Sequence, residues 1–95
     1  MSTDHDWDVL GYVEASHYRT DVLTRLGEGP ATPTMIAEDI EYEVTHVSRC
    51  LRELKQRDLV ELLVDESVRK GRFYGITADG DDALAGLEQI GEVDA

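Results

Sequence analysis

The stretch TPTMIAEDIEYEVTHVSRCLREL, residues 32–54, decides the fold because two helical patterns lie in it on either side of a short break. The first pattern begins with Thr32 as an N-cap and Pro33 at the first helical position, where a missing N–H costs nothing because that donor has no partner within the helix. Its apolar stripe consists of Met35, Ile36 and Ile40. The sequence therefore predicts a short helix that packs through one face.

The second pattern in this stretch has two unlike faces. Its apolar face, at helical spacing, consists of Val44, Val47, Leu51 and Leu54. Its opposite face is polar and cationic and consists of Thr45, Ser48, Arg49, Arg52 and Gln56. A short helix joined by a tight turn to a longer helix of this kind is a helix-turn-helix, in which the second helix enters the major groove of DNA.

A β-hairpin is predicted directly after the second helix. Residues 59–64 and 72–76 are rich in β-branched, aliphatic and aromatic side chains, and residues 65–71 connect them as a loop that is longer than a tight turn. The densest cation cluster in the chain lies at this loop and consists of Arg69, Lys70 and Arg72. Such a loop, beside a DNA-reading helix, contacts the phosphate backbone or places an arginine in the minor groove.

A further helix is predicted before this stretch, over residues 17–26. Ser16 is expected to cap it. Gly27 and Gly29-Pro30 are expected to end it, because glycine allows a left-handed cap and proline then forbids continuation. Its inward residues are expected to be Tyr18, Val22, Leu23 and Leu26. Asp21 and Arg25 stand four residues apart and are expected to form an exposed ion pair.

A last helix is predicted after the hairpin. Thr77 is its expected N-cap, and Asp79 lies in its first turn, where the positive end of the helix dipole favours an acid. Its apolar stripe consists of Ala83, Leu84, Leu87 and Ile90. Gly86 and Gly91 make this helix weak alone, so we expect it to pack on a partner.

The N-terminal residues permit two interpretations. Residues 1–6 are polar and read as a frayed tail. The apolar residues that follow, Trp7, Val9, Leu10, Val13 and Ala15, fit a short amphipathic helix, although Gly11 in its middle costs about 1 kcal/mol relative to alanine. An extended arm is the alternative. In either case we expect Trp7 to be buried, against its own core or against a second subunit.

Short motifs follow one another in a recognisable order along the chain. They are Ile36-Ala37-Glu38, Val47-Ser48-Arg49, Leu59-Val60-Glu61, the basic loop and Tyr74-Gly75-Ile76-Thr77. This order resembles the winged helix-turn-helix regulators of archaea and bacteria, a broad set that includes the ArsR-like and MarR-like repressors. The similarity covers roughly residues 16–87.

This resemblance implies an α+β fold, a winged helix-turn-helix that is mainly helical with a two-stranded β-hairpin wing. It also implies a DNA-binding transcription factor that is usually dimeric. The length of 95 residues suits one domain, over residues 1–95 with a core of about 16–87. The chain departs from the family pattern in the turn, where Gly followed by a Ser or Thr cap is common. Here that turn contains Glu41 and Glu43.

The charge of the chain is severe and unevenly distributed. The formal net charge is -12 over 95 residues, which alone argues against nucleic acid because cations supply most non-specific affinity for phosphate. Residues 44–72, however, carry seven cations and five acids, whereas the remainder carries two cations and sixteen acids. The cations are therefore concentrated where a helix-turn-helix and wing contact DNA.

An acidic surface with only two lysines, Lys55 and Lys70, resembles proteins of extreme halophiles, and we take that as the origin of this chain. A moderately acidic mesophile domain that binds protein is the alternative. At molar salt the Debye length is about 3 Å, so long-range attraction to DNA is screened and contact geometry contributes more of the binding.

The sequence also predicts a compartment. Cys50 is the single cysteine, so we expect no intramolecular disulfide. We also expect the protein to work in a reducing cell interior. The start of the chain has neither a basic region nor an apolar run of the kind that signal peptides contain. No stretch approaches the length needed to cross a bilayer. We therefore expect a cytoplasmic protein.

Catalytic and metal chemistry have weak candidates. His46 and Cys50 are one helical turn apart and could form half of a metal site, as in a small metal sensor. The ArsR-like metal sensors need further thiolates that this chain lacks, so we expect Cys50 to occupy a small semi-buried position beside Val47 and Leu51. We expect no enzyme activity, no cofactor and no metal.

DNA binding is expected to rest on Arg49 and Arg52, because arginine donates bidentately to guanine O6 and N7 and also pairs with phosphate. The further candidates are Thr45, His46, Ser48 and Gln56 on the helix and Arg69, Lys70 and Arg72 on the wing. The alternative for these cations is an ordinary solvated surface.

The function expected from the sequence is that of a sequence-specific regulator of transcription that binds double-stranded DNA. We expect it to act as a homodimer through its first and last helices. The alternative is a winged-helix module for protein–protein interaction without DNA binding, in which the acidic surface is the working face.

Overall fold

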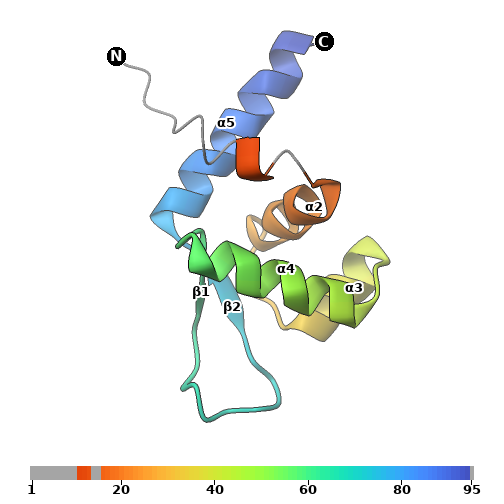
Figure 1. Ribbon diagram of the computed structural model, residues 1–95, viewed down its shortest axis with the longest axis vertical. Helices are drawn as coiled ribbons and strands as arrows, with labels where there is room; N and C mark the ends of the chain where they lie inside the picture. Colours follow the sequence, from red (N-terminus) through yellow and green to blue (C-terminus); the bar gives the residue numbers. More distant parts are fainter. Residues whose placement is uncertain (1–10, 14–15, 95) are drawn as a thin grey trace.

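The computed structural model describes residues 11–13 and 16–94 (Figure 1). Residues 11–13 are helical. The elements that follow are α2 (His17–Leu26), α3 (Pro33–Ile40), α4 (Val44–Gln56), β1 (Val60–Leu62), β2 (Tyr74–Ile76) and α5 (Ala78–Asp94). This order confirms the predicted winged helix-turn-helix. The predicted tail at residues 1–6, and Trp7, lie outside the described residues.

The core lies where α2, α3 and α4 meet the hairpin, as the apolar faces predict. The largest fully buried side chains are Leu23, Leu26, Ile36, Leu51, Leu54, Leu59, Val13, Val22, Val47 and Val60. Full burial of such a side chain stabilises the fold by about 1.5–3 kcal/mol before conformational costs. The same burial fixes which side of α4 faces solvent.

Three helices begin with the side-chain caps that the sequence predicts. Thr32 Oγ1 accepts the backbone N–H of Met35 at 3.2 Å, and Pro33 occupies the first helical position. Ser16 Oγ accepts from the N–H of Arg19 at 3.4 Å, and Thr77 Oγ1 accepts from Gly80 at 3.0 Å.

The hairpin is a two-stranded antiparallel sheet with a short addition at its edge. Val60 pairs with Ile76 and Leu62 with Tyr74. Ala31, between α2 and α3, forms an isolated antiparallel bridge to Tyr74, with N···O distances of 3.1 and 2.9 Å. This bridge ties the hairpin to the start of the helix-turn-helix.

Both strands are shorter than the predicted ranges 59–64 and 72–76. Pairing continues for one more bond, from the N–H of Leu63 to the carbonyl of Phe73 at 2.8 Å, and the two chains then separate. They separate because the loop beyond, residues 64–72, makes its own internal hydrogen bonds, described below. From here on we call this loop the wing.

Three residues predicted to face inward are exposed instead. Tyr18 and Met35 are each 38% exposed, and Val44 is 43% exposed. All three lie in the first turns of α2, α3 and α4, and the buried residues of these helices come from later turns. Apolar spacing identified the correct face of each helix but extended it too far toward the N-terminus.

The predicted pair of Asp21 and Arg25 is also wrong. Arg25 Nε lies 2.6 Å from Oδ2 of Asp39 on α3, and the Asp21 carboxylate accepts a hydrogen bond from the Tyr42 hydroxyl. Both side chains therefore connect helices rather than stabilising α2 locally.

Helix α2 ends at Leu26, directly before the predicted Gly27 and Gly29-Pro30. Gly27 has φ -62, so it does not adopt the left-handed conformation, which comes two residues later at Gly29 with φ 146. Backbone bonds from Glu28 and Gly29 to the carbonyls of Arg25 and Leu26 continue the turn in between.

Tyr12 fastens the N-terminal residues to α2 and α4. The Cζ atoms of Arg19 and Arg57 lie 4.0 and 3.9 Å from the centroid of its ring. Arg19 also donates from Nη1 to the Tyr12 carbonyl at 2.9 Å and from Nε to Glu53 at 3.2 Å. The segment before α2 is thereby connected to the C-terminal half of α4.

Helix α5 packs on α2 and β2 through its first half and then extends away from the hairpin (Figure 1). Ala83 is buried, while Leu84 and Leu87 are half-buried. The predicted fourth residue of this stripe, Ile90, lies beyond the side chains that the structure describes. Among the described residues, no helix is long and apolar enough to cross a membrane.

Candidate nucleic-acid interface

The outer face of α4 is exposed as the sequence predicts. Val47, Leu51 and Leu54 are fully buried, which turns the opposite side of this amphipathic helix to solvent. All five residues predicted for the polar face are exposed, namely Thr45, Ser48, Arg49, Arg52 and Gln56. Two guanidinium groups therefore project from one helix face.

The wing is held together by Arg72. Its Nε donates to the carbonyl of Val68 at 2.5 Å and its Nη2 donates to the carbonyl of Glu66 at 2.6 Å. Arg72 is half-buried, whereas Arg69 and Lys70 are exposed. The three predicted wing cations thus differ in role, since Arg72 shapes the loop and the other two present charge on it.

A turn at the start of the wing adds to this order. The Asp65 carboxylate accepts the backbone N–H of Ser67 at 2.8 Å, which lowers the pKa of Asp65 because the bond favours the charged form. The carbonyl of Asp65 also accepts the N–H of Val68 at 2.9 Å. At the other end, Gly71 has φ 68, a conformation that glycine adopts without strain.

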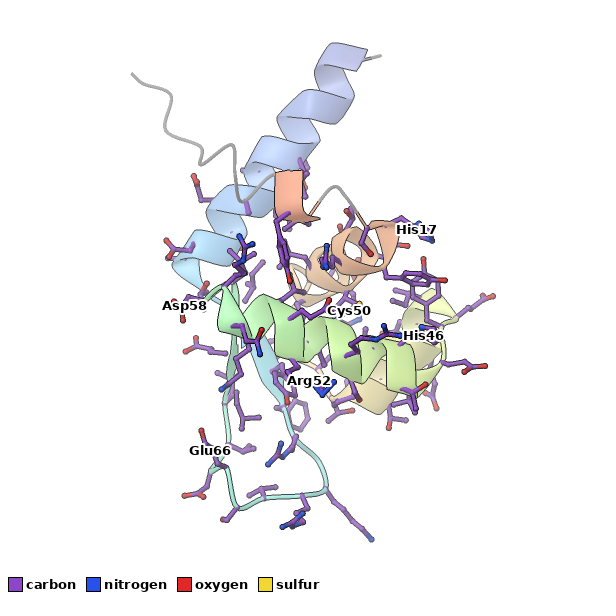
Figure 2. All side chains as sticks on the ribbon, in the orientation of Figure 1. His17, His46, Cys50, Arg52, Asp58 and Glu66 are labelled. Atoms are coloured by element: carbon purple, nitrogen blue, oxygen red, sulfur yellow. The ribbon has the colours of Figure 1, made fainter. Side chains whose placement is uncertain are left out.

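A cleft of about 800 Å³ lies between α4, the wing and the start of α3. Its cations are Arg52, Lys55, Arg69, Lys70 and Arg72, and its acid is Glu66. Figure 2 shows Arg52 on the side of α4 that faces the hairpin and Glu66 on the wing. Cations from two segments separated in sequence therefore line one concave surface, which we call the basic cleft.

The basic cleft also contains neutral hydrogen-bonding groups. The hydroxyls of Thr32, Thr34 and Ser48 belong to its lining, together with Tyr74. Hydroxyl, guanidinium and ammonium groups are the side chains that contact phosphate and sugar in protein–DNA complexes. The arrangement suits a phosphodiester backbone.

The predicted site residues fall into two groups. The structure brings Ser48, Arg52, Arg69, Lys70 and Arg72 together in the basic cleft. Thr45, Arg49 and Gln56 are exposed on α4 but are not part of the cleft lining. They project from the side of α4 opposite its buried residues.

The basic cleft also contains polar residues that were not predicted as site residues, namely Thr32, Thr34, Lys55, Glu66 and Tyr74. Lys55 follows Arg52 by three positions, a helical spacing that places both on one side of α4. The sequence pattern predicts Thr32 only as a helix cap and gives Thr34 no role. Their signal was their place at the N-terminus of the first helix of the motif, which lies next to DNA in this architecture.

His46 takes a different place from the other candidates. Its ring is half-buried and stacks on Tyr18 of α2, with centroids 5.4 Å apart and an interplanar angle of 20°. Tyr18 also meets Tyr42 edge to face at 5.0 Å and stacks on His17 at 4.5 Å. We call these four rings the aromatic cluster, and Figure 2 shows His17 and His46 on the side of the molecule away from Glu66.

The Tyr42 hydroxyl anchors the aromatic cluster. It donates to the Asp21 carboxylate, and this hydrogen bond, with burial and the nearby negative charge, raises the pKa of Tyr42 to about 12. The phenol is therefore a neutral donor at ordinary pH. None of these ring contacts was predicted from the sequence.

Cys50 lies against the core, as expected. It is 6% exposed, and burial, followed by the charge of Glu53, raises the pKa of its thiol. A raised pKa keeps the thiol protonated and disfavours both metal ligation and nucleophilic chemistry. Within the described residues, no group of three or more His, Cys, Asp or Glu side chains could hold a metal ion.

Comparison with solved structures finds the same fold in several chains, among them a MarR-family transcription regulator with a TM-score of 0.73 at 17% identity, over 81% of this chain and 52% of that one. The regulator BldR from Sulfolobus solfataricus superposes with a TM-score of 0.72 at 20% identity, over 84% of this chain and 58% of that one. A variant of S. aureus MepR bound to an oligodeoxyribonucleotide gives 0.74 at 21% identity, over 87% and 62%. Bordetella bronchiseptica BpsR gives 0.72 at 20% identity, over 79% and 58%.

These similarities establish a winged-helix fold of the MarR type. The chain spans a little over half the length of these four regulators. No family model and no curated protein matches the sequence.

Proposed function

We propose that this chain is a transcription regulator that binds double-stranded DNA sequence-specifically, with α4 in the major groove and the wing on the adjacent backbone or in the minor groove. The basic cleft carries this proposal, since cations of α4 and of the wing share one surface in a chain of net charge -12. The MarR-type fold supports it, because a MepR variant of the same fold has been solved with an oligodeoxyribonucleotide.

Each group of residues has its own part in this proposal. Arg49 and Thr45, outermost on α4, contact base edges, where arginine reads guanine bidentately. Ser48, Arg52 and Lys55 contact the phosphates that border the groove, and Gln56 reaches bases or sugar at the end of the helix. Arg69 and Lys70 contact the backbone beside the wing.

A homodimer is the second part of the proposal. The second half of α5 extends beyond the α2 and β2 surfaces that its first half covers, and Leu87 remains half-buried on it. Two copies joined through the N-terminal residues and α5 would present two α4 helices to successive major grooves, as dimeric helix-turn-helix proteins do. Occupancy of a promoter would then exclude or recruit other proteins.

The decisive experiment measures DNA binding with and without the two α4 arginines. A random duplex library is selected on the parent protein in concentrated potassium chloride, and fluorescence anisotropy then gives the Kd of the enriched duplex and of a scrambled duplex. Arg49→Ala/Arg52→Ala is expected to weaken the enriched duplex by about a hundredfold, since the arginine–guanine pair of Arg49 contributes about 1–3 kcal/mol and the lost phosphate contact of Arg52 adds to it. The scrambled duplex is expected to weaken less.

A matched control separates local contacts from net charge. Thr24→Glu/Ala78→Glu lowers the net charge by the same two units, at an exposed position of α2 and at the exposed first residue of α5. This variant is expected to bind like the parent, because salt screens distant charges. If instead no duplex is enriched, or the arginine variant keeps parental affinity and preference, the chain is better described as a protein-binding winged helix.

The dimer has an independent test. Light scattering after size exclusion in the same salt is expected to give twice the mass of one chain for the parent. Leu87→Asp is expected to give a monomer that remains folded, because this residue is only half-buried within one chain. A parent that is monomeric at assay concentrations overturns this part alone.

A further inference from the structure

The first turn of α4 lacks the side-chain cap that this position usually has. Glu43 is the N-cap residue and makes no side-chain capping bond, so its carbonyl alone closes the turn, with the N–H groups of His46 and Val47 at 3.0 and 3.1 Å. Glu41, just before it, has φ 61, a left-handed conformation that a non-glycine residue rarely adopts. Backbone bonds from the N–H groups of Glu41 and Tyr42 to the Ala37 carbonyl fix this turn on its α3 side. No capping side chain fixes it on its α4 side.

The aromatic cluster supplies the missing support from another helix. Tyr18 on α2 stacks on His46 in the first turn of α4 and meets Tyr42 in the turn before it. The hydroxyl of Tyr42 is in turn bonded to Asp21, one turn further along α2. Rings on both sides of the Glu43 cap are thus tied to a single helix.

The residues that this cluster controls are those proposed to read DNA. Thr45 adjoins His46, and Arg49 follows one turn later on the outward face of α4. Contacts to base edges need side chains held within about 0.5 Å and 10–20° of the right geometry. A first turn free to rotate or fray would blur the difference between correct and incorrect base pairs.

We propose that Tyr18, a partly exposed residue of α2 outside the DNA-contacting surface, is a positioning residue for sequence recognition: through the rings of His46 and Tyr42 it holds the uncapped first turn of α4 in register with the bases. This inference rests on the proposed function and deepens it. The α2 contact acts on discrimination between sequences, whereas the wing and the basic cleft act on affinity for any duplex.

The test compares Tyr18→Ala with Tyr18→Phe, which keeps the ring and its stacking. The measured quantity is the ratio of the Kd for the scrambled duplex to the Kd for the enriched duplex. A partly unfolded variant weakens both duplexes equally, so the ratio does not respond to a merely structural loss. Tyr18→Ala is expected to lower this ratio about tenfold, the size of one lost base contact, and Tyr18→Phe is expected to leave it within about twofold.

A double-mutant cycle tests the route through His46. If Tyr18 acts through the His46 ring, the Kd ratio for Tyr18→Ala/His46→Ala equals the lower of the two single-variant ratios. If the two substitutions instead lower the ratio by the product of their separate effects, Tyr18 does not act through His46. Hydrogen exchange without DNA adds a second readout. In Tyr18→Ala the amides of Val47 and Ser48 are expected to exchange faster, with that of Leu54 unchanged.

The outcomes distinguish this inference from the proposed function. The positioning role alone is overturned under three conditions. The parent prefers the enriched duplex, the Arg49→Ala/Arg52→Ala variant loses that preference, and the Kd ratio of Tyr18→Ala equals that of the parent. A parent without any sequence preference overturns both.

Discussion

The carbonyl oxygen of Leu59 lies so close to Gly80 that a Cβ atom at that position would overlap it. The same added atom would be 2.6 Å from Cγ1 of Ile76. This approach lets the first turn of α5 pack directly on the residue that precedes β1. Thr77 reinforces it, since its N–H donates to the Leu59 carbonyl at 3.1 Å and its hydroxyl to that of Asp58 at 2.7 Å.

Gly80→Ala is therefore expected to lower the free energy of unfolding by about 2 kcal/mol or more, because backbone atoms must move to accept the methyl group. Chemical denaturation in concentrated potassium chloride measures this. Gly11→Ala is the matched control, since a Cβ there meets nothing within 4 Å, and it is expected to change stability by less than about 1 kcal/mol. Equal stability of the two variants would contradict the close approach.

Tyr12 is expected to stabilise the fold through its two guanidinium neighbours. Tyr12→Leu keeps an apolar side chain but loses the contacts of Arg19 and Arg57, and we expect a loss of about 1–2 kcal/mol in the free energy of unfolding. Tyr12→Phe keeps the ring face and is expected to lie within about 0.5 kcal/mol of the parent. A phenylalanine variant as unstable as the leucine variant would show that the hydroxyl, not the ring, matters.

Arg72→Lys tests the internal order of the wing. Lysine keeps the charge but cannot bond the carbonyls of Glu66 and Val68 together as the guanidinium does. We expect the amides of residues 66–71 to exchange about tenfold faster, because a hydrogen bond to a charged group contributes about 1.5–3 kcal/mol.

Arg69→Lys is the comparison for this wing variant, since Arg69 is exposed on the same loop. Hydrogen exchange by NMR is expected to find its wing amides as slow as those of the parent. Unchanged exchange in Arg72→Lys would mean that the loop is ordered by other contacts.

Tyr42 gives a prediction at alkaline pH. Its pKa is about 12 in the folded protein and near 10 when unfolded, so the folded state holds the phenolic proton more tightly. The stability from its bond to Asp21 is therefore complete below pH 10 and is lost as the pH rises from 10 to 12. The difference in denaturation midpoint between the parent and Tyr42→Phe is expected to shrink over that interval. A constant difference would contradict a role of the Tyr42 hydroxyl in this stability, because every other side chain is the same in both proteins.

Much of the fold could be predicted because its signals are local. The Thr32 cap, the Pro33 position and the spacing of Val47, Leu51 and Leu54 each depend on a few neighbouring residues, and the structure confirms them. The separate placement of cations on α4 and on the wing could also be read from the chain, since the architecture brings the two segments to one side.

Other features depend on partners far apart in the sequence. Arg25 bonds Asp39, fourteen positions away, in preference to Asp21, four positions away, and no helical spacing reveals that choice. Tyr18 looked like a core residue because apolar periodicity does not show which turn of a helix reaches the core. Arg72 looked like its neighbours because composition does not show which guanidinium folds back on its own loop.

The Arg72 guanidinium, which folds back on the wing, lowers the entropic cost of binding a ligand there. The connection between Leu63 and Phe73, if it were left free, would lose conformational entropy of about 1–2 kcal/mol per residue on being immobilised at a surface. Arg72 and the Asp65 turn impose much of that restriction when the chain folds, so the wing is preorganised before any partner arrives. Replacement of the exposed Arg69 or Lys70 therefore leaves this restriction in place, whereas replacement of Arg72 returns part of the entropic penalty to the binding step.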